Sequence, residues 1–230
     1  MSRYWNRSQK AETRFWSNKD NYYGYYSQSF WEKKLRDDGL DPTFFSDASV
    51  IELGCGPFGL IHYLDSPRVK YGVDPLISTY RDLGLLQDGG VTHLEMQAEC
   101  IEVPDCSFDI AISYNTLDHV AVPLAYLKEA NRILKENGKL YLNVHVFHKL
   151  LFPILPALRY IDSPHPWHFS ESKVRYLLRK AGFEIEASRR YPVHLLGRSV
   201  KKRIGRLIAF HAVYIARKDA PTKQKDLQCQ

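Results

Sequence analysis

The ten residues "VIELGCGPFG", from Val50 to Gly59, join a short apolar run to a glycine-rich turn. The glycines have the spacing G-x-G-x-x-G, with Gly54 first and Gly59 last. Because glycine has no Cβ, such a turn after a strand lets the backbone pass close to a nucleotide. The motif alone is weak evidence, so the identity of the nucleotide has to come from other parts of the chain.

Strand-like and helix-like segments alternate on both sides of this turn. Strands are predicted at residues 49–54, 69–75, 91–98, 108–115 and 139–146, and helices at 60–64, 79–86, 123–137 and 170–183. Gly138 is predicted to stop the third of these helices, and Ser170 to cap the fourth. The alternation predicts an α/β fold, a Rossmann-like mostly parallel sheet with helices on both faces. Residues 184–191 and 208–217 are predicted to add a C-terminal antiparallel strand pair.

The chain divides into three predicted parts. Residues 1–45 form an N-terminal helical extension, residues 46–220 the α/β domain, and residues 221–230 a flexible tail. The extension is rich in aromatic residues, which suit either packing on the core or a lid over a ligand. In a lid, the side chains facing the ligand would be Tyr22, Tyr23, Tyr25 or Tyr26.

Composition and charge narrow the class of protein. The chain of 230 residues has a net charge of +6, and from Arg189 to Lys218 it has nine Lys or Arg and no acidic residue. That excess indicates either an anionic partner or a solvated basic face. The polar N-terminus and the lack of a long apolar run predict a cytoplasmic protein. The cysteines have no metal-ligand spacing, so we predict reduced thiols and no metal site.

Two nucleotides, NAD and S-adenosyl-L-methionine (SAM), fit the glycine turn. Asp74 closes the second strand, where a carboxylate accepts hydrogen bonds from the ribose of either. Glu52, inside the first strand, favours SAM, because a carboxylate there suits the cationic amino group of a methionine moiety. A buried acid without such a partner would be costly. Pro57 and Phe58 also favour SAM, because a bulky ring is awkward against a pyrophosphate.

Together with "QAECIEVPDCSFDIAISYNTLDHV", these features resemble the class I SAM-dependent methyltransferases, especially the small-molecule group with E-L-G-C-G in the first loop and S-F-D at the fourth strand. The resemblance covers about Val50 to Gly182 and the final strands. It implies transfer of a methyl group from SAM, with release of S-adenosyl-L-homocysteine (SAH). The residues that it implies for the cofactor are Glu52, Gly54, Cys55, Gly56, Asp74, Gln97, Ala98, Glu99, Tyr114 and Asn115, with Leu117 and His119 near the sulfonium.

Two positions depart from the family pattern. Phe58 stands where the third glycine is expected, and Gly59 follows it by one residue. Gln97 stands where an acid commonly faces the adenine amino group. These departures keep open a second class of function, a methyltransferase-like binding protein without catalysis.

Histidines supply the candidates for acid–base chemistry. His145 and His148 end the fifth predicted strand, and His165 and His168 lie in "SPHPWHFS" before a helix. A histidine there could take a proton from a hydroxyl acceptor, although each could equally be structural. The predicted catalytic residues are His168, His165 and His119.

The acceptor itself is predicted only by class. We expect a small or medium metabolite. A glycan-linked, lipidic or anionic metabolite is compatible with the sequence. Residues 148–161 are apolar, and they either line the binding site of such an acceptor or pack as the end of a helix. Residues 195–208 form a basic amphipathic segment, which suits either peripheral membrane contact or an ordinary surface helix. RNA methylation is an alternative prompted by the basic C-terminal third, but nucleic acid is not favoured, because there is no N-P-P-Y signature and no RNA-binding module.

Overall fold

The computed structural model describes residues 3–22, 26–86, 89–148, 166–192 and 209–219. Seven strands in these ranges form one sheet in the order β3-β2-β1-β4-β5-β7-β6. β1 to β5 pair with one another in parallel, whereas β7 is antiparallel to both β5 and β6. The strands are β1 Ser49–Leu53, β2 Val69–Val73, β3 Thr92–Leu94, β4 Phe108–Tyr114, β5 Leu134–Phe147, β6 Phe183–Pro192 and β7 Ala209–Lys218. The predicted fold class, including the antiparallel C-terminal pair, is confirmed.

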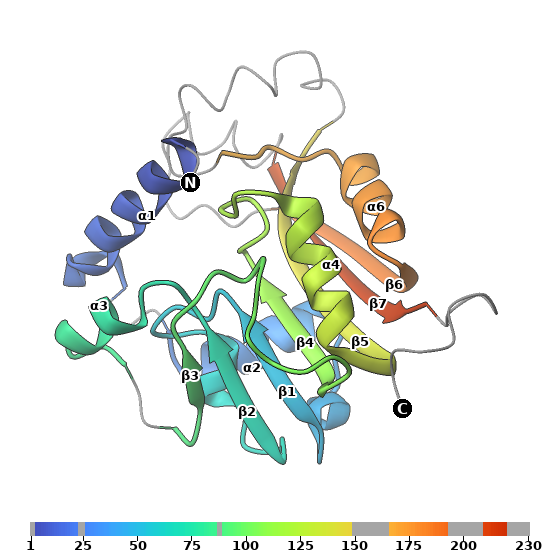
Figure 1. Cartoon of the computed structure of the whole chain (residues 1–230), viewed down its shortest axis with the longest axis horizontal. Coiled ribbons are helices and arrows are strands. Elements are labelled where there is room, and N and C mark those ends of the chain that lie inside the picture. The colour runs from blue at the N-terminus through green and yellow to red at the C-terminus, as the bar shows by residue number, and fades with distance from the viewer. Residues whose placement is uncertain (1–2, 23–25, 87–88, 149–165, 193–208, 220–230) are drawn as a thin grey trace.

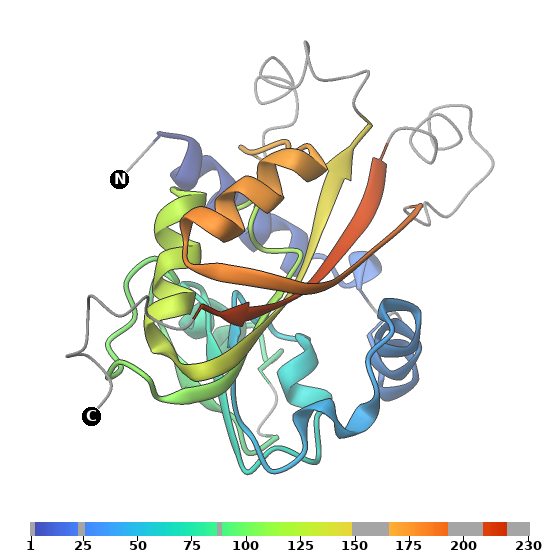
Figure 2. The same cartoon turned by 90° about the vertical axis from the view of Figure 1, so that its right-hand side faces the viewer.

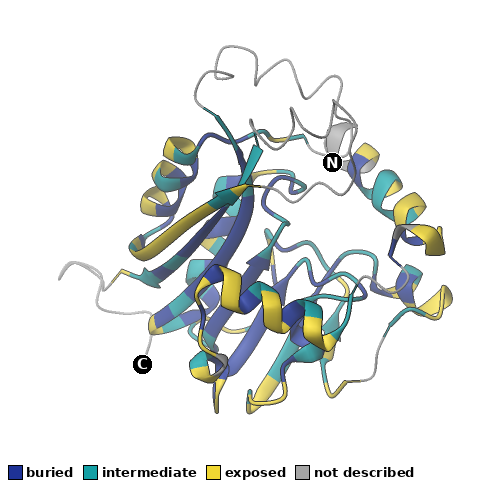
Figure 3. Cartoon of the chain, turned by 180° about the vertical axis from the view of Figure 1, so that it is seen from behind, coloured by how far each residue is buried: buried dark blue, intermediate teal, exposed yellow. Residues whose placement is uncertain are grey.

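Helices pack on both faces of the sheet (Figure 1). α4 (Pro123–Ile133) and α6 (Glu171–Lys180) cover one face, where Tyr126, Ala130 and Leu178 are buried against the strands. α2 (Gln28–Asp38) and α3 (Ile77–Asp82) belong to the other face, where Trp31 and Tyr80 join the core. Every residue of β1 is buried, as expected of a strand in the middle of a parallel sheet. Viewed from behind, α2 shows its exposed residues outward and the strands lie buried behind it (Figure 3).

The first helix, α1 (Arg3–Trp16), lies beside the ends of the strands rather than on a face of the sheet (Figure 1). Its last residue, Trp16, packs against Tyr22, Tyr26 and Phe58 at ring-centroid distances of 5.5, 5.9 and 5.8 Å. Tyr26 stacks on Phe58 with an interplanar angle of 7°. The aromatic residues of the extension therefore pack onto the glycine turn through Phe58.

Several predicted boundaries are wrong. The helix predicted at residues 123–137 ends at Ile133, and Gly138 lies inside the long strand β5 instead of stopping a helix. The cause is an irregular register with β4, in which Phe108 pairs with Leu134 and Ile110 with Lys139. The helix predicted at 60–64 is a single 3₁₀ turn, Leu60–Tyr63. The cap on α6 is confirmed, because the Ser170 hydroxyl accepts from Lys173 N at 3.3 Å.

Other predictions fall partly or wholly outside the described ranges. These are most of the apolar segment 148–161, the basic segment 195–208 and the tail 221–230. Cys55 and Cys100 are free thiols, but Cys106 is disulfide-bonded, so the prediction of reduced cysteines is wrong at Cys106. In the described parts of the chain, no helix combines the length and the apolar character that a bilayer-spanning helix requires.

Candidate active site

The glycine turn after β1 takes a backbone shape that only glycine adopts readily. Gly54 has φ 75° and Gly56 has φ 52°, both in the left-handed region. A Cβ on Gly54 would lie 2.2 Å from Cγ2 of Thr116, so the turn and the loop after β4 touch here without room for a side chain. Among the described residues beyond its chain neighbours, a Cβ on Gly56 would have only Trp16 within 4 Å, at 3.8 Å, so this position opens toward the cavity described below.

Gly59 has a different role. A Cβ there would lie 2.2 Å from the Cys55 carbonyl oxygen and 2.7 Å from Oε2 of Glu52. The third glycine of the motif is therefore required by the folding of the loop on itself. Phe58, at the position where a glycine was expected, belongs to the aromatic packing of the extension, and its carbonyl accepts from Trp31 Nε1 at 3.1 Å.

Glu52 is buried beneath this turn, with 1% of its surface exposed. Its Oε2 accepts a hydrogen bond from Ile61 N at 2.8 Å, which fixes the carboxyl group inside the loop. Burial raises the pKa of Glu52 to about 8, because the charged form loses its hydration. A cationic group in the cavity would offset that cost.

Asp74 follows β2 and faces the same turn. Its two carboxylate oxygens accept from Gly56 N at 3.0 Å and from Leu76 N at 2.9 Å. Burial raises the pKa of Asp74 to about 6, although these backbone hydrogen bonds act in the opposite direction. The carboxylate is thus held in one orientation at the carboxyl end of β2, where open α/β sheets bind their ligands.

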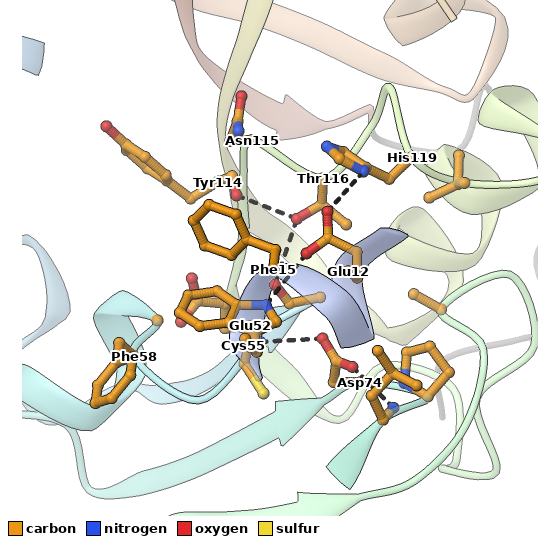
Figure 4. A pocket seen from close by; sticks show the side chains of 18 of the residues that line it. Glu12, Phe15, Glu52, Cys55, Phe58, Asp74, Tyr114, Asn115, Thr116 and His119 are labelled. Carbon is orange, nitrogen blue, oxygen red and sulfur yellow. Dashed lines mark hydrogen bonds and ion pairs between the residues drawn. The ribbon is translucent and has the colours of Figure 1, made fainter. Parts of the chain in front are cut away.

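A cavity of about 600 Å³ opens above these residues, at the carboxyl ends of β1, β2 and β4 (Figure 4). The structure brings together every residue predicted for the cofactor, since all of them line this cavity: Glu52, Gly54, Cys55, Gly56, Asp74, Gln97, Ala98, Glu99, Tyr114 and Asn115. Leu117 is different, because it is fully buried in the core under α4.

Two polar atoms on the cavity wall are buried and have no hydrogen-bond partner among the described residues. They are Oδ1 of Asn115 and Oε1 of Gln9. Asn115 has φ 54°, and its backbone N donates to the Asn143 carbonyl at 2.8 Å, so the turn after β4 aims this residue at the cavity. Buried polar atoms are normally satisfied, so these two are suited to donors on a ligand.

Of the three histidines predicted to act in catalysis, His119 lines the cavity. Its Nδ1 lies 3.3 Å from Oε1 of Glu12, which reaches across from α1 (Figure 4). The described His168 does not line the cavity, and its ring lies 5.3 Å from that of Phe147. His165 lies outside the described residues.

The segment "SPHPWHFS" contributes through Trp167. Its Nε1 donates to the Val120 carbonyl at 2.8 Å, and on the other side Glu99 accepts from Ala121 N at 2.7 Å. Together they hold the loop that carries His119. In the sequence, the one signal for Trp167 is its position between His165 and His168.

The far side of the cavity was largely missed from the sequence. Besides Tyr114 and the previously noted His145, it is lined by Lys34 of α2 and His211 of β7. Glu12, Gln9 and Thr116 also line the cavity. Thr116 lies between the predicted residues Asn115 and Leu117. The others belong to no motif, because each is brought to the cavity by an element distant in the sequence.

Comparison with known proteins identifies the class. Residues 23–188 match the methyltransferase domain family, so the chain belongs to that family, which implies SAM as the methyl donor. The fold is that of the class I SAM-dependent methyltransferases, and the chain is accordingly an enzyme of that type. No curated protein gives a significant match to the sequence.

Solved structures with the same fold are distant in sequence. A candidate methyltransferase from Bacillus halodurans C-125 has a TM-score of 0.64 at 16% identity, over 84% of this chain and 100% of its own. A SAM-dependent methyltransferase from Thermotoga maritima, described as a possible histamine N-methyltransferase, has a TM-score of 0.58 at 22% identity, over 93% and 95%. A candidate methyltransferase from Haloferax volcanii, in complex with the activator Trm112, has a TM-score of 0.66 at 14% identity, over 96% and 99%.

Proposed function

We propose that this chain transfers the methyl group of SAM to a small or medium-sized metabolite that shares one cavity with the cofactor. The observation that carries this proposal is the cavity itself. It is bounded on one side by the glycine turn with Glu52 and Asp74, and on the other by Lys34, His145 and His211.

The residues present fit SAM. The carboxylate of Glu52 is suited to the cationic amino group of SAM, and the carboxylate of Asp74 is suited to the ribose hydroxyls. Gly56 leaves open space beside the turn, and Gln97 and Ala98 line the cavity where the adenine is expected. The buried Oδ1 of Asn115, which has no partner in the described parts of the chain, provides one further acceptor. Tyr114 and Cys55 complete the proposed cofactor wall.

When bound, SAM supplies an activated methyl group on a sulfonium. The protein then has to hold the acceptor in line with that methyl and to exclude water, which are effects of alignment. α1, with Glu12 and Trp16 on the cavity wall, is suited to covering the cofactor. His119 stays a candidate for contact with the acceptor, because it lines the cavity from the loop after β4.

Calorimetry with SAM, SAH and NAD tests the first half of this proposal. We expect SAM and SAH to bind and NAD to give no heat of binding. Tight binding of NAD without binding of SAM would refute it. Incubation with methyl-labelled SAM and a fractionated metabolite extract then tests the second half, and binding of SAM without labelling of any fraction would favour a binding protein over an enzyme of small metabolites.

A further inference from the structure

We propose that His211 is the catalytic base that removes a proton from a hydroxyl group on the acceptor, and that Asn143 and Asp38 hold it in the tautomer this requires. The inference rests on the proposed function. It adds to that function a class of acceptor, an alcohol or a phenol, and the residue that activates it.

His211 lies in a row of polar rings that crosses three strands. In the sheet register, His211 of β7 pairs with His145 of β5 on one side and with Tyr191 of β6 on the other. The ring centroids of His211 and His145 are 4.6 Å apart, and those of His211 and Tyr191 are 5.0 Å apart. These three strands run side by side at one end of the sheet (Figure 2), and both histidines line the cavity.

A buried carboxylate anchors this row. Asp38, at the end of α2, has 3% of its surface exposed and accepts hydrogen bonds from the hydroxyls of Tyr141 and Tyr191. Burial raises the pKa of both phenols, so the tyrosines keep their protons and act as donors. Asp38 therefore acts here as an acceptor only.

Asp38 in turn fixes the side-chain amide of Asn143. The Nδ2 group of Asn143 donates to Oδ2 of Asp38 at 3.0 Å, and so its Oδ1 faces Nδ1 of His211 at 3.1 Å. An amide oxygen only accepts, so Nδ1 of His211 must carry the hydrogen. In a neutral imidazole the lone pair then resides on Nε2, and this nitrogen becomes the base.

The proposed base, His211, is oriented by further polar groups, as general bases beside a nucleophile commonly are. Burying a carboxylate, an amide and two phenols around one imidazole is costly unless every group is satisfied, as it is here. Lys34 is also close, since its Nζ donates to the Tyr191 hydroxyl at 2.9 Å.

The reaction transfers the methyl group to the acceptor oxygen and the hydroxyl proton to His211. As the acceptor oxygen forms its bond to the methyl carbon, the bond between that carbon and sulfur breaks and its electron pair stays on sulfur. The proton of the hydroxyl passes to Nε2 of His211 and leaves later to water. A hydroxyl is a weak nucleophile at neutral pH, so this acceptor class gains most from such a base.

The tautomer can be measured without knowing the acceptor. In the full chain, labelled with ¹⁵N-histidine and saturated with SAH, two-bond ¹⁵N–¹H correlation spectra should show His211 with its hydrogen on Nδ1. The signal is assigned by its loss in His211→Gln. Asn143→Leu should shift His211 toward the Nε2–H form, whereas Asn131→Leu, which loses a bond to the Gly182 carbonyl instead, should not.

A second variant covers the chance that Asn143→Leu does not fold. Asp38→Asn keeps the shape of the side chain but no longer fixes the orientation of the Asn143 amide, so it should give a mixture of tautomers. A hydrogen on Nε2 of His211 in the wild-type protein would overturn the proposal.

Turnover separates this inference from the proposed function. With methyl-labelled SAM and a fractionated metabolite extract, His211→Gln should lower labelling about 100-fold or more while SAM affinity is unchanged. His93→Gln is the control, because its ring stacks on His62 and does not line the cavity. Near wild-type labelling by His211→Gln, or labelling of amines only, would overturn this inference and leave the proposed function standing. No labelling by the wild-type enzyme would refute the proposed function, and this inference with it.

Discussion

Oε1 of Glu12 lies 3.3 Å from Nδ1 of His119, so the first helix is paired with the loop after β4. The other oxygen, Oε2, accepts from Trp16 Nε1 at 3.2 Å, which fixes the carboxylate on α1. Both residues of the pair line the cavity. A side chain from the start of the chain therefore closes part of the wall that the glycine turn and the β4 loop leave open.

We predict that Glu12→Gln speeds the dissociation of SAH by about two- to tenfold, because a single side-chain hydrogen bond contributes about 0.5–1.5 kcal/mol. Stopped-flow displacement measures this rate. Glu32→Gln is the matched control, since Glu32 forms an exposed ion pair with Arg36 on α2. Equal rates in the two variants would mean that α1 does not hold the cofactor through this contact.

Asp74→Ala should weaken SAM binding by about 1.5–3 kcal/mol, the usual cost of losing hydrogen bonds to a charged acceptor. The fold should survive, because Asp74 lies just beyond the end of β2. Calorimetry gives the affinity, and a melting curve checks the fold. Asp82→Ala, at an exposed position of α3, should leave both unchanged. A collapse of the melting temperature with normal SAM affinity would show that Asp74 is structural.

The raised pKa of Glu52 predicts that the stability of the protein without cofactor falls with rising pH. A carboxyl with a pKa of about 8 in the folded state and near 4.5 in the unfolded state favours folding below pH 4.5, and this contribution is lost as the pH rises through 8. Asp74, with a pKa of about 6, acts in the same direction at lower pH. Burial lowers the pKa of His62 to about 4. The contribution of His62 to stability therefore rises with pH between about 4 and 6.5, opposite to that of Glu52.

Of these three groups, only Glu52 has a folded-state pKa in the window from pH 7 to 8. Urea unfolding of the wild-type protein should show stability falling across it, and Glu52→Gln should flatten the curve. A fall of equal size in Glu52→Gln would assign the effect to another group.

Cofactor binding should release a proton from Glu52. A cationic ligand favours the ionised carboxylate, so SAM binding at pH 7 moves Glu52 from mostly protonated to charged. Calorimetry in two buffers of different ionisation enthalpy measures this release. Glu52→Gln should abolish it, whereas proton uptake by the wild-type protein would contradict the predicted contact.

Gly54→Ala should destabilise the protein by clearly more than Gly84→Ala. Both glycines have positive φ, 75° and 67°, so each alanine costs about 1–2 kcal/mol of backbone strain. Only at Gly54 does the added Cβ also meet Thr116 at 2.2 Å, whereas at Gly84 it meets nothing in the described residues within 4 Å apart from its chain neighbours. Urea unfolding measures the difference. Adding Thr116→Ser, which removes Cγ2, should recover part of it, and equal losses at the two glycines would exclude the steric clash.

Local patterns in the sequence were enough for the half of the cavity that we propose holds the cofactor. The glycine turn, Glu52 and Asp74 lie within a few residues of strand ends, and the strands of a parallel sheet bring their carboxyl ends to one edge. The cap at Ser170 likewise depends on residues three apart in the chain. The end of α4 was missed because the irregular register between β4 and β5 draws residues from Leu134 onward into a strand.

The proposed acceptor side of the cavity was decided by tertiary structure alone. Asp38 and Asn143 are 105 residues apart in the chain, and Asn143 and His211 are 68 apart, yet their side chains form one hydrogen-bonded chain. No periodicity links them, because the contact depends on the insertion of β7 between β5 and β6 and on the packing of α2 on that face. Short-range propensities specify turns and caps, whereas the partner of a buried polar group is set by which distant elements the sheet order places side by side.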